Sequence, residues 1–331
     1  TSMGEEKDNR VSSEKNNSIY ANAAAGLIGS STAKVFVHPI DTLKAKIQVM
    51  RIERTKAFTL SNSVLASTFR DTFRAEGLGG LYRGFAVALL GSMPASILYF
   101  GSYEFFKRNS LENEYLQKRP FLAYLAGGMF AESVACILFV PVDVIKERRQ
   151  VQHNLKKYNY TNDIDAIRQI KQSEGVRGLY RAYGATVMSF GPFSALYFTF
   201  YETMKGLFLH RTLWPPVAER EEESFKPEIG FFPSMICSMF AGGAASILTN
   251  PLDIAKLRLQ VQRAGAASST GVQDFYYKHM VDAMFKIGRD EGFRALYNGS
   301  LARVLYHVPT VAISMSVLER VKPSVKNWLA S

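Results

Sequence analysis

The chain has 331 residues, a net charge of +11 and 47% hydrophobic residues. Its basic balance suits a nucleic acid or an anionic membrane surface, but no zinc-ligand spacing or RNA-binding aromatic motif is present, so we expect a membrane and no nucleic acid. Two cysteines are too few for a disulfide framework. Neither a metal site nor the nucleophile–base pair of an enzyme stands out.

The chain opens with a polar segment followed by an apolar one. Residues 1–18 are mixed in charge and carry no secretory or Arg-rich targeting pattern, so they predict a disordered tail. The apolar run over about residues 19–37 is interrupted by Pro39, and a charged stretch continues to about residue 51. Because a proline kinks a helix, this part predicts one bent helix, long enough to cross a hydrocarbon layer about 30 Å thick.

A polar connector with an amphipathic helix follows, and the same order of elements then returns twice. In the first third, the connector helix covers about residues 61–75 and the next apolar run covers residues 85–106. We therefore predict an all-α membrane protein of six tilted transmembrane helices, with three short amphipathic helices along one face of the membrane. The three pseudo-symmetric repeats are expected at residues 19–115, 118–212 and 228–328.

One motif ends the first apolar run of every repeat. A proline is followed two residues later by aspartate, three residues further on by lysine, and a glutamine stands nine residues after the proline. The copies begin at Pro39, Pro141 and Pro251. Each repeat also contains a Glu-Gly pair, an aromatic–basic–Gly triplet or a variant of it, and a terminal Glu-x-x-Lys segment that an aromatic residue precedes in the first two repeats.

These motifs closely resemble those of the mitochondrial carrier family over about residues 19–328. The resemblance implies a multi-pass antiporter of the mitochondrial inner membrane, with both termini on the intermembrane-space side and the three short amphipathic helices on the matrix side. It also implies bound cardiolipin and no cofactor. The lipid-binding residues are expected to be Gly77, Arg83, Gly84, Gly175, Arg181, Gly292 and Gly299. Ala182 and Asn298 depart from the family pattern and weaken the lipid contact expected of the second and third repeats, and Leu318 replaces the third bracing aromatic residue.

The resemblance further implies two rings of ion pairs that form alternately at the two ends of a central cavity. The matrix gate is expected to consist of Asp41, Lys44, Gln48, Asp143, Lys146, Gln150, Asp253, Lys256 and Gln260. The cytoplasmic gate is expected to consist of Tyr103, Glu104, Lys107, Tyr201, Glu202, Lys205, Glu319 and Lys322. An exposed pair contributes about 0–1 kcal/mol, so such rings suit a gate that solute binding opens. The alternative is that these charges are helix caps and surface pairs.

The resemblance also locates the substrate contacts, which are counted back from the terminal glutamates. They are Gly91, Ser92, Ser189, Phe190, Tyr306 and His307. Lys34 and Glu132 lie within membrane helices, where charge is costly unless it faces water or a partner. Either Lys34 holds a carboxylate or phosphate and Glu132 an ammonium, or the two form a structural pair. His307 either contacts the solute, with a proton to exchange, or packs at a helix interface.

Phe190 and Tyr306 favour a solute with an apolar or aromatic part, and the expected site lacks the several arginines that a phosphate-rich nucleotide needs. We therefore expect alternating-access transport of a small amino-acid-like or S-adenosylmethionine-like zwitterion. The partners would be this solute and membrane lipids, and the protein would otherwise be a monomer. One alternative is an accessory subunit of a larger respiratory complex with little transport. A second is a nucleotide or cofactor carrier.

Overall fold

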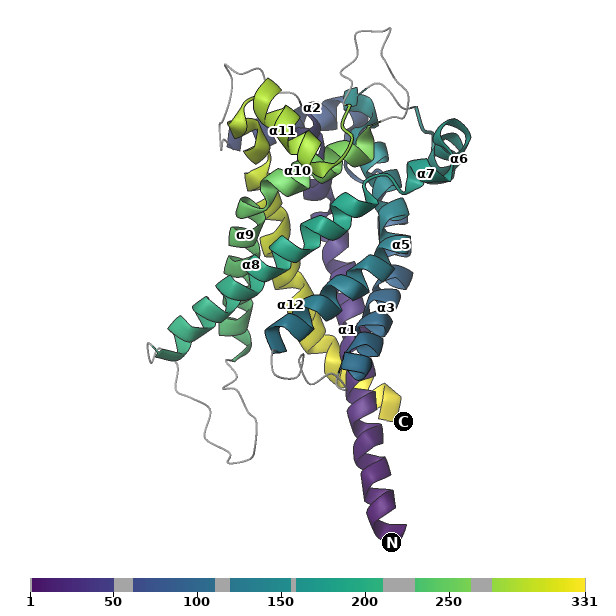
Figure 1. Cartoon of the computed structure of the whole chain (residues 1–331), viewed down its shortest axis with the longest axis vertical. Coiled ribbons are helices and arrows are strands. Elements are labelled where there is room, and N and C mark those ends of the chain that lie inside the picture. Colours follow the sequence, from purple (N-terminus) through teal and green to yellow (C-terminus); the bar gives the residue numbers. More distant parts are fainter. Residues whose placement is uncertain are drawn as a thin grey trace.

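The computed structural model describes residues 2–50, 62–110, 120–155, 159–210, 230–262 and 276–330. Long helices running the length of the molecule dominate this part of the chain (Figure 1). They are α1 (Ser2–Val49), α3 (Phe85–Ser110), α5 (Pro120–Leu155), α8 (Tyr183–His210), the pair α9 (Phe231–Leu248) and α10 (Asn250–Val261), and α12 (Ser300–Ala330). The described residues contain helices and connections but no strand, and the predicted all-α class is confirmed.

The long helices close into a ring of neighbours. α1 packs along α12, α3 along α5 and α8 along α9, while α5 also contacts α8 and α9 contacts α12. The first and last long helices therefore lie side by side (Figure 1). At Gly29 a Cβ atom would stand 2.6 Å from the main-chain oxygen of Ser314, so a small residue at this point permits the close approach of α1 and α12.

Short helices gather at one end of the bundle, opposite the chain termini (Figure 1). They are α2 (Asn62–Leu81), α6 (Asp163–Glu174), α7 (Val176–Leu179), α11 (Met280–Asp290) and the 3-10 helix η2 (Phe293–Tyr297). Helices α2, α6 and α11 correspond to the three amphipathic connectors expected from the sequence. We call this end of the molecule the capped end and the opposite one the terminal end.

Local hydrogen bonds explain where α6 and α11 begin. The side chain of Asn162 accepts from the amide of Asp165 at 2.8 Å, and the Asp165 carboxylate accepts from the amide of Thr161 at 2.9 Å. At α11 the Asp282 carboxylate accepts from the amide of Lys278 at 2.8 Å. These main-chain hydrogen bonds hold the pKa of Asp165 and of Asp282 below its usual value, because they favour the charged form. Both carboxylates therefore stay ionised, and their negative charge stabilises the N-terminus of the helix.

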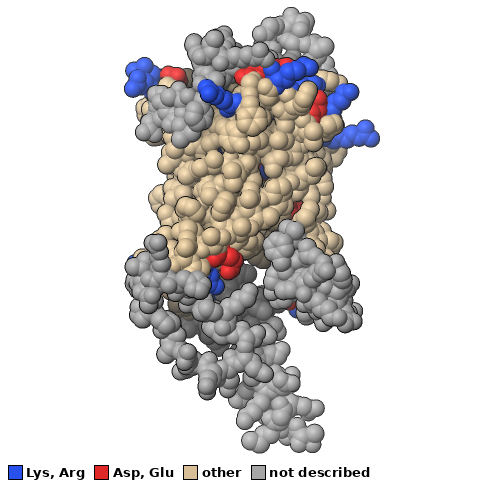
Figure 2. Space-filling model, turned by 60° about the vertical axis from the view of Figure 1, so that its left-hand side comes forward, with Lys and Arg blue, Asp and Glu red and all other residues tan. Residues whose placement is uncertain are grey.

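The middle of the bundle suits a bilayer. Among the described residues, four helical stretches are long and apolar enough to span one: Phe85–Phe106, Ala126–Leu155, Phe231–Leu248 and Phe293–Val325. Figure 2 shows a broad belt without charged side chains between charged ends on the face that it presents. Large apolar side chains such as Phe36, Leu90 and Phe240 are more than half exposed, which is expected of a surface that faces lipid.

Two details differ from the sequence-based expectations. Residues 1–18, predicted to be disordered, belong to α1 from Ser2 onward, because this proline-free segment extends an existing helix and so avoids the cost of nucleation. The fifth long helix was expected to bend as the first and third do, but it is divided into α9 and α10. The division occurs at Thr249, whose φ of −91° and ψ of 5° lie outside the α-helical range; Pro39 and Pro141, at the same motif position, stay inside undivided helices.

Candidate functional site

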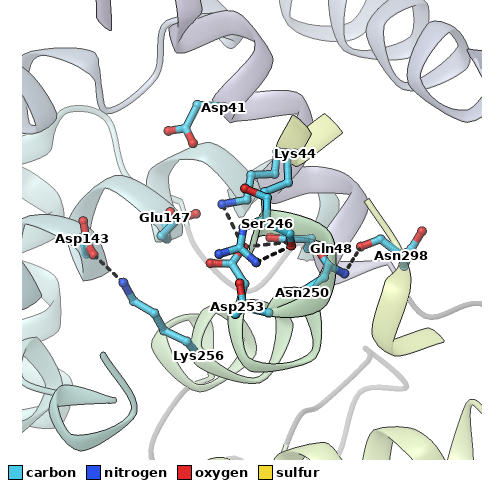
Figure 3. A network of polar contacts seen from close by, with 12 residues as sticks. Asp41, Lys44, Gln48, Asp143, Glu147, Ser246, Asn250, Asp253, Lys256 and Asn298 are labelled. Carbon is cyan, nitrogen blue, oxygen red and sulfur yellow. Dashed lines mark hydrogen bonds and ion pairs between the residues drawn. The ribbon is translucent and has the colours of Figure 1, made fainter. Parts of the chain in front are cut away.

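Three ion pairs join the repeats at one level of the bundle, next to the capped end, and we call them the Asp–Lys ring. The pairs are Lys146–Asp41 at 2.9 Å, Lys256–Asp143 at 3.1 Å and Lys44–Asp253 at 2.9 Å. Each lysine therefore pairs with the aspartate of the preceding repeat, in a closed cycle. Figure 3 shows the Asp143–Lys256 pair and other ring members facing a common space.

Helix geometry explains why the motif gives this ring. Asp41 and Lys44 are three residues apart, so both project from the same face of α1, and the other two repeats have the same spacing. Their side chains are 10–26% exposed. Pairs that are only partly desolvated contribute little net stability each. Separating the three ion pairs of the ring therefore costs little free energy.

The motif glutamines do not behave alike. Gln48 donates to the Asp253 carboxylate at 3.0 Å. Gln150 donates to Thr42 at 3.1 Å and to the Asp41 carboxylate at 3.4 Å. The side-chain nitrogen of Gln260 is buried without a hydrogen-bond partner among the described residues. The structure thus differs from the expectation that all three glutamines brace an ion pair, since the Asp143–Lys256 pair has no such brace.

A second set of charged pairs lies beyond the ring, and sequence reasoning missed it. These pairs are Lys46–Glu76, Arg148–Glu174 and Arg258–Glu291. Every side chain in them is at most 8% exposed. They fasten each connector to the long helix before it. The signal is in the sequence, because a basic residue stands two positions after the motif lysine in every repeat, but the motifs alone assign no partner to that basic residue or to the glutamate of the Glu-Gly pair.

The residues expected to hold cardiolipin form part of this second layer. Arg83 contacts the Glu76 carboxylate at 2.5 Å, and Arg181 contacts that of Glu174 at 3.4 Å. Asn298 donates instead to the main-chain oxygen of Ile47 at 2.8 Å. The expected glycines all have positive φ angles, from 65° to 93°: Gly77, Gly84, Gly175, Gly292 and Gly299. Their lipid contact stays a prediction, whereas their backbone geometry is a fold requirement.

Two cavities lie on the inner side of the Asp–Lys ring. The larger measures about 250 Å³ and the smaller about 140 Å³. Both are lined by Asp41, Asp143, Lys146 and Tyr306, so the ring forms a common floor. Of the expected substrate contacts, Glu132, Ser189, Phe190, Tyr306 and His307 line the larger cavity, and Lys34, Ser92 and Tyr306 line the smaller.

Lys34 and Glu132 have separate partners. The Lys34 ammonium donates to the Ser92 hydroxyl, whereas the Glu132 carboxylate accepts from the Cys136 thiol at 3.6 Å. No ion pair joins Lys34 to Glu132 among the described residues, so the structural-pair alternative does not hold in this conformation. Each charge instead faces a cavity with only a neutral hydrogen-bonding neighbour, which leaves it able to bind an ion of opposite sign.

Gly91 and His307, two of the expected substrate contacts, both pack against side chains of neighbouring helices. A Cβ atom at Gly91 would stand 2.3 Å from the Val142 side chain, and Gly91 lines neither of the two cavities. Its small size allows α3 to approach α5, and its contact with the solute stays a prediction. The His307 ring stacks on Phe193 of α8 at 5.4 Å while lining the larger cavity, so it packs between helices and its contact with the solute stays a prediction.

The cavity also contains charged residues that the sequence analysis did not select. Glu147 and Arg303 line the larger cavity and are 7% and 6% exposed. Arg303 lies 3.5 Å from the Asp253 carboxylate, and Glu147 lies 3.1 Å from Lys146. Both were overlooked because neither occupies a position of the repeated motifs.

The terminal end contrasts with the ring. Glu104 contacts Arg108 of its own helix at 3.5 Å, and the Tyr201 hydroxyl bonds to that of Ser234 at 2.9 Å. The described side chains of Glu104, Glu202, Lys205, Glu319 and Lys322 form no ion pair with one another, and the side chain of Lys107 lies outside the described residues. The second expected ring is thus not assembled among the described side chains.

Comparison with known proteins agrees with this geometry. The sequence matches the description "Mitochondrial carrier protein" over residues 15–114, 117–212 and 227–327, one segment for each structural repeat. Mitochondrial substrate carrier family protein E of Dictyostelium discoideum is 31% identical over 94% of this chain and 96% of its own length. Mitoferrin of the same organism is 30% identical over 93% and 95%. The mitochondrial S-adenosylmethionine carrier protein of Mus musculus is 28% identical over 86% and 87%.

Proposed function

Because the chain belongs to the mitochondrial carrier family, whose members are multi-pass transporters of the mitochondrial inner membrane and not enzymes, we propose that its solute is a small zwitterion. The solute is amino-acid-like or S-adenosylmethionine-like, and it is exchanged by alternating access. The similarity to the mouse S-adenosylmethionine carrier protein supports the second of these two classes.

One observation carries the proposal: two opposite charges without ionic partners of their own face the space above a closed ring. Lys34 has a hydroxyl as its neighbour and Glu132 a thiol. Lys34 would bind the carboxylate of the solute and Glu132 its ammonium, because charge-assisted hydrogen bonds are the strongest polar contacts available in such a site. Phe190 and Tyr306, which line the larger cavity, would contact an apolar or aromatic part of the solute.

The Asp–Lys ring acts as the matrix gate in this proposal. The ring end then faces the matrix, the chain termini face the intermembrane space, and the conformation is open on the cytoplasmic side. The separated terminal glutamates and lysines support this assignment, since they would pair only in the opposite conformation. Three weak ion pairs amount to a few kcal/mol in total, which the binding energy of one charged solute can match.

Cardiolipin would bind at the positive-φ glycines of the capped end. A positive-φ glycine stands directly before the first residue of η2 and of α12, and of α3 in the first repeat, and main-chain amides at a helix N-terminus bind phosphate. The third repeat lacks the basic residue at Asn298, so its contact would be the weakest. The protein would act as a monomer, with these lipids as its partners.

Uptake into liposomes containing the purified protein tests the proposal. The probes are radiolabelled arginine, lysine and S-adenosylmethionine, with the same compound inside the vesicle for exchange, and ADP as the nucleotide control. We expect exchange of a zwitterion and none of ADP. Exchange of ADP alone would overturn the proposed solute class. No exchange of any probe, with recovery of the protein in a respiratory complex, would favour the accessory-subunit alternative.

A further inference from the structure

Residues that occur in all three repeats form the pseudo-symmetric parts of the protein, such as the Asp–Lys ring, but a solute has no three-fold symmetry. Charges at the cavity that break the symmetry are therefore candidates for contact with the solute. Lys34 and Glu132 are two of them, because their counterparts are Cys136 and Ser246 for the lysine, and Ser30 and Gly242 for the glutamate. The structure adds two more, Glu147 and Arg303.

Glu147 lies six residues after its motif proline. The corresponding positions hold Ala45 and Leu257, both apolar and at most 4% exposed. Lys146, which contacts Glu147 at 3.1 Å, already has Asp41 at 2.9 Å. The second carboxylate oxygen of Glu147 is buried without a hydrogen-bond partner among the described residues. A buried carboxylate that no donor fully satisfies costs free energy, and the ring does not need it.

Arg303 is the positive counterpart on the other side of the same cavity. The corresponding positions hold Ala88 and Thr186. One Arg303 nitrogen donates to the main-chain oxygen of Ser246 at 2.9 Å, and the guanidinium lies over the Phe193 ring at 5.6 Å. Its Nε atom is buried without a hydrogen bond, at 3.5 Å from the Asp253 carboxylate.

The ring is electrically complete without this pair. Its three aspartates already match its three lysines, so Glu147 and Arg303 add one charge of each sign to a site that is closed without them. Each has a polar atom that lacks a hydrogen bond, and each shares a partner with the ring. A solute that engages Glu147 and Arg303 would therefore compete directly with contacts that keep the ring closed.

We propose that Glu147 and Arg303 are specificity-determining residues that form a second dipolar subsite at the cavity floor. Glu147 accepts the additional cationic group of the solute, and Arg303 binds its carboxylate together with Lys34. The inference rests on the proposed function and narrows it to solutes that carry more charge than a neutral amino acid. It also assigns to this subsite the coupling between solute binding and ring opening.

Two sets of probes, each removing one charge at a time, test the subsite by ligand-induced thermal stabilisation of the purified protein. Citrulline lacks the side-chain cation of arginine, and agmatine lacks its carboxylate. S-adenosylhomocysteine lacks the sulfonium of S-adenosylmethionine, and the decarboxylated compound lacks its carboxylate. We expect the fully charged member of at least one set to bind tightest, by about tenfold or more, as one charged hydrogen bond implies.

The variants Glu147→Gln and Arg303→Gln should separate the two charges. Glu147→Gln should reduce the preference for the additional cation to about twofold or less and leave the preference for the carboxylate unchanged. Arg303→Gln should weaken the preference for the carboxylate, which Lys34 would still bind, and should leave the preference for the additional cation unchanged. Asp290→Asn, at a side chain that is 58% exposed, is the surface control and should alter neither preference. If a glutamine variant does not fold, Glu147→Asp and Arg303→Lys withdraw the charge from the cavity and should weaken the same preference.

The outcomes distinguish a failure of the subsite from a failure of the proposed function. Variants that fold but keep both preferences of the wild type would show that Glu147 and Arg303 are internal ion partners, and the subsite would be wrong while the proposed function stands. A wild-type protein that none of the probes stabilises would overturn the proposed solute class, and the subsite with it.

Discussion

Arg258 of the third repeat donates from its Nε atom to the main-chain oxygen of Gln48 in the first repeat, at 3.1 Å. A second guanidinium nitrogen donates to the main-chain oxygen of Met50 at 3.2 Å. Arg148 likewise holds the main-chain oxygens of Gln260 and Gln262, at 3.1 and 3.0 Å. A clamp of this kind therefore closes two of the three junctions between repeats.

The third junction, between the first and second repeats, has lysine in place of arginine. Lys46 bonds to Thr72 and Glu76 of its own repeat. Lys46→Arg should complete the clamp on the second repeat and stabilise the closed ring by about 1.5–3 kcal/mol, the range for hydrogen bonds from a charged group. A higher melting temperature in detergent would show this. The reverse change, Arg258→Lys, is the matched control and should lower it; an increase for both variants would contradict the clamp.

The second prediction concerns the partners within the Asp–Lys ring. Asp143→Lys should abolish uptake, because it puts a like charge beside Lys256, the partner at 3.1 Å. Adding Lys256→Asp should restore part of the uptake by reversing the pair. Adding Lys44→Asp should not, since Lys44 pairs with Asp253. Liposome uptake measures all three variants, and equal rescue by both lysine changes would contradict the cyclic pairing.

Lys34 offers a test of solute binding that is separate from folding. Lys34→Ala should abolish uptake and leave the melting temperature nearly unchanged, because the contact that it loses is one hydrogen bond to the Ser92 hydroxyl. Asp290→Asn, at a side chain that is 58% exposed, is the control and should keep the uptake. A large loss of stability in Lys34→Ala, with uptake retained in the folded fraction, would make the lysine structural.

The buried pair Arg148–Glu174 should be essential to stability. Its side chains are 0% and 1% exposed, so Glu174→Leu leaves a buried guanidinium without its carboxylate and should cost about 3–5 kcal/mol. The double variant Arg148→Met, Glu174→Leu should be less destabilised than Glu174→Leu alone, because the only guanidinium left without its carboxylate is that of Arg181, which is 22% exposed. Chemical unfolding in detergent gives both values. Arg181→Ala, at a contact of 3.4 Å, should have a much smaller effect.

Ala182 adopts a φ angle of 68°, whereas Gly84 and Gly299 hold the same position in the other repeats with φ angles of 75° and 78°. The left-handed conformation costs an L-residue about 1–2 kcal/mol, and the greater freedom of unfolded glycine offsets about 0.5–1 kcal/mol of that. Ala182→Gly should therefore stabilise the protein slightly, as a rise in melting temperature. Gly184→Ala, which meets no atom within 4 Å, is the neighbouring control and should not destabilise by strain.

Most of the fold could be predicted from the sequence because the same pattern of residues occurs three times along the chain. The recurrence of proline, aspartate, lysine and glutamine at fixed spacing predicted the repeats, the kinked helices and the residues of the Asp–Lys ring. Three-fold repetition in a closed bundle brings equivalent residues to the same level, so the repeated spacing together with the family resemblance was sufficient. For the same reason, the connectors α2, α6 and α11 were expected where the structure has them.

What only the tertiary structure decided is how individual residues depart from that symmetry. The cyclic order of the pairs, the packing of Gly91 against Val142, and the separate partners of Lys34 and Glu132 depend on which helices are neighbours and how they tilt. Glu147 and Arg303 belong to no repeated motif, and only their shared cavity relates them. Helix spacing fixes which residues share a face, but contacts between residues more than 100 positions apart arise only when the helices pack.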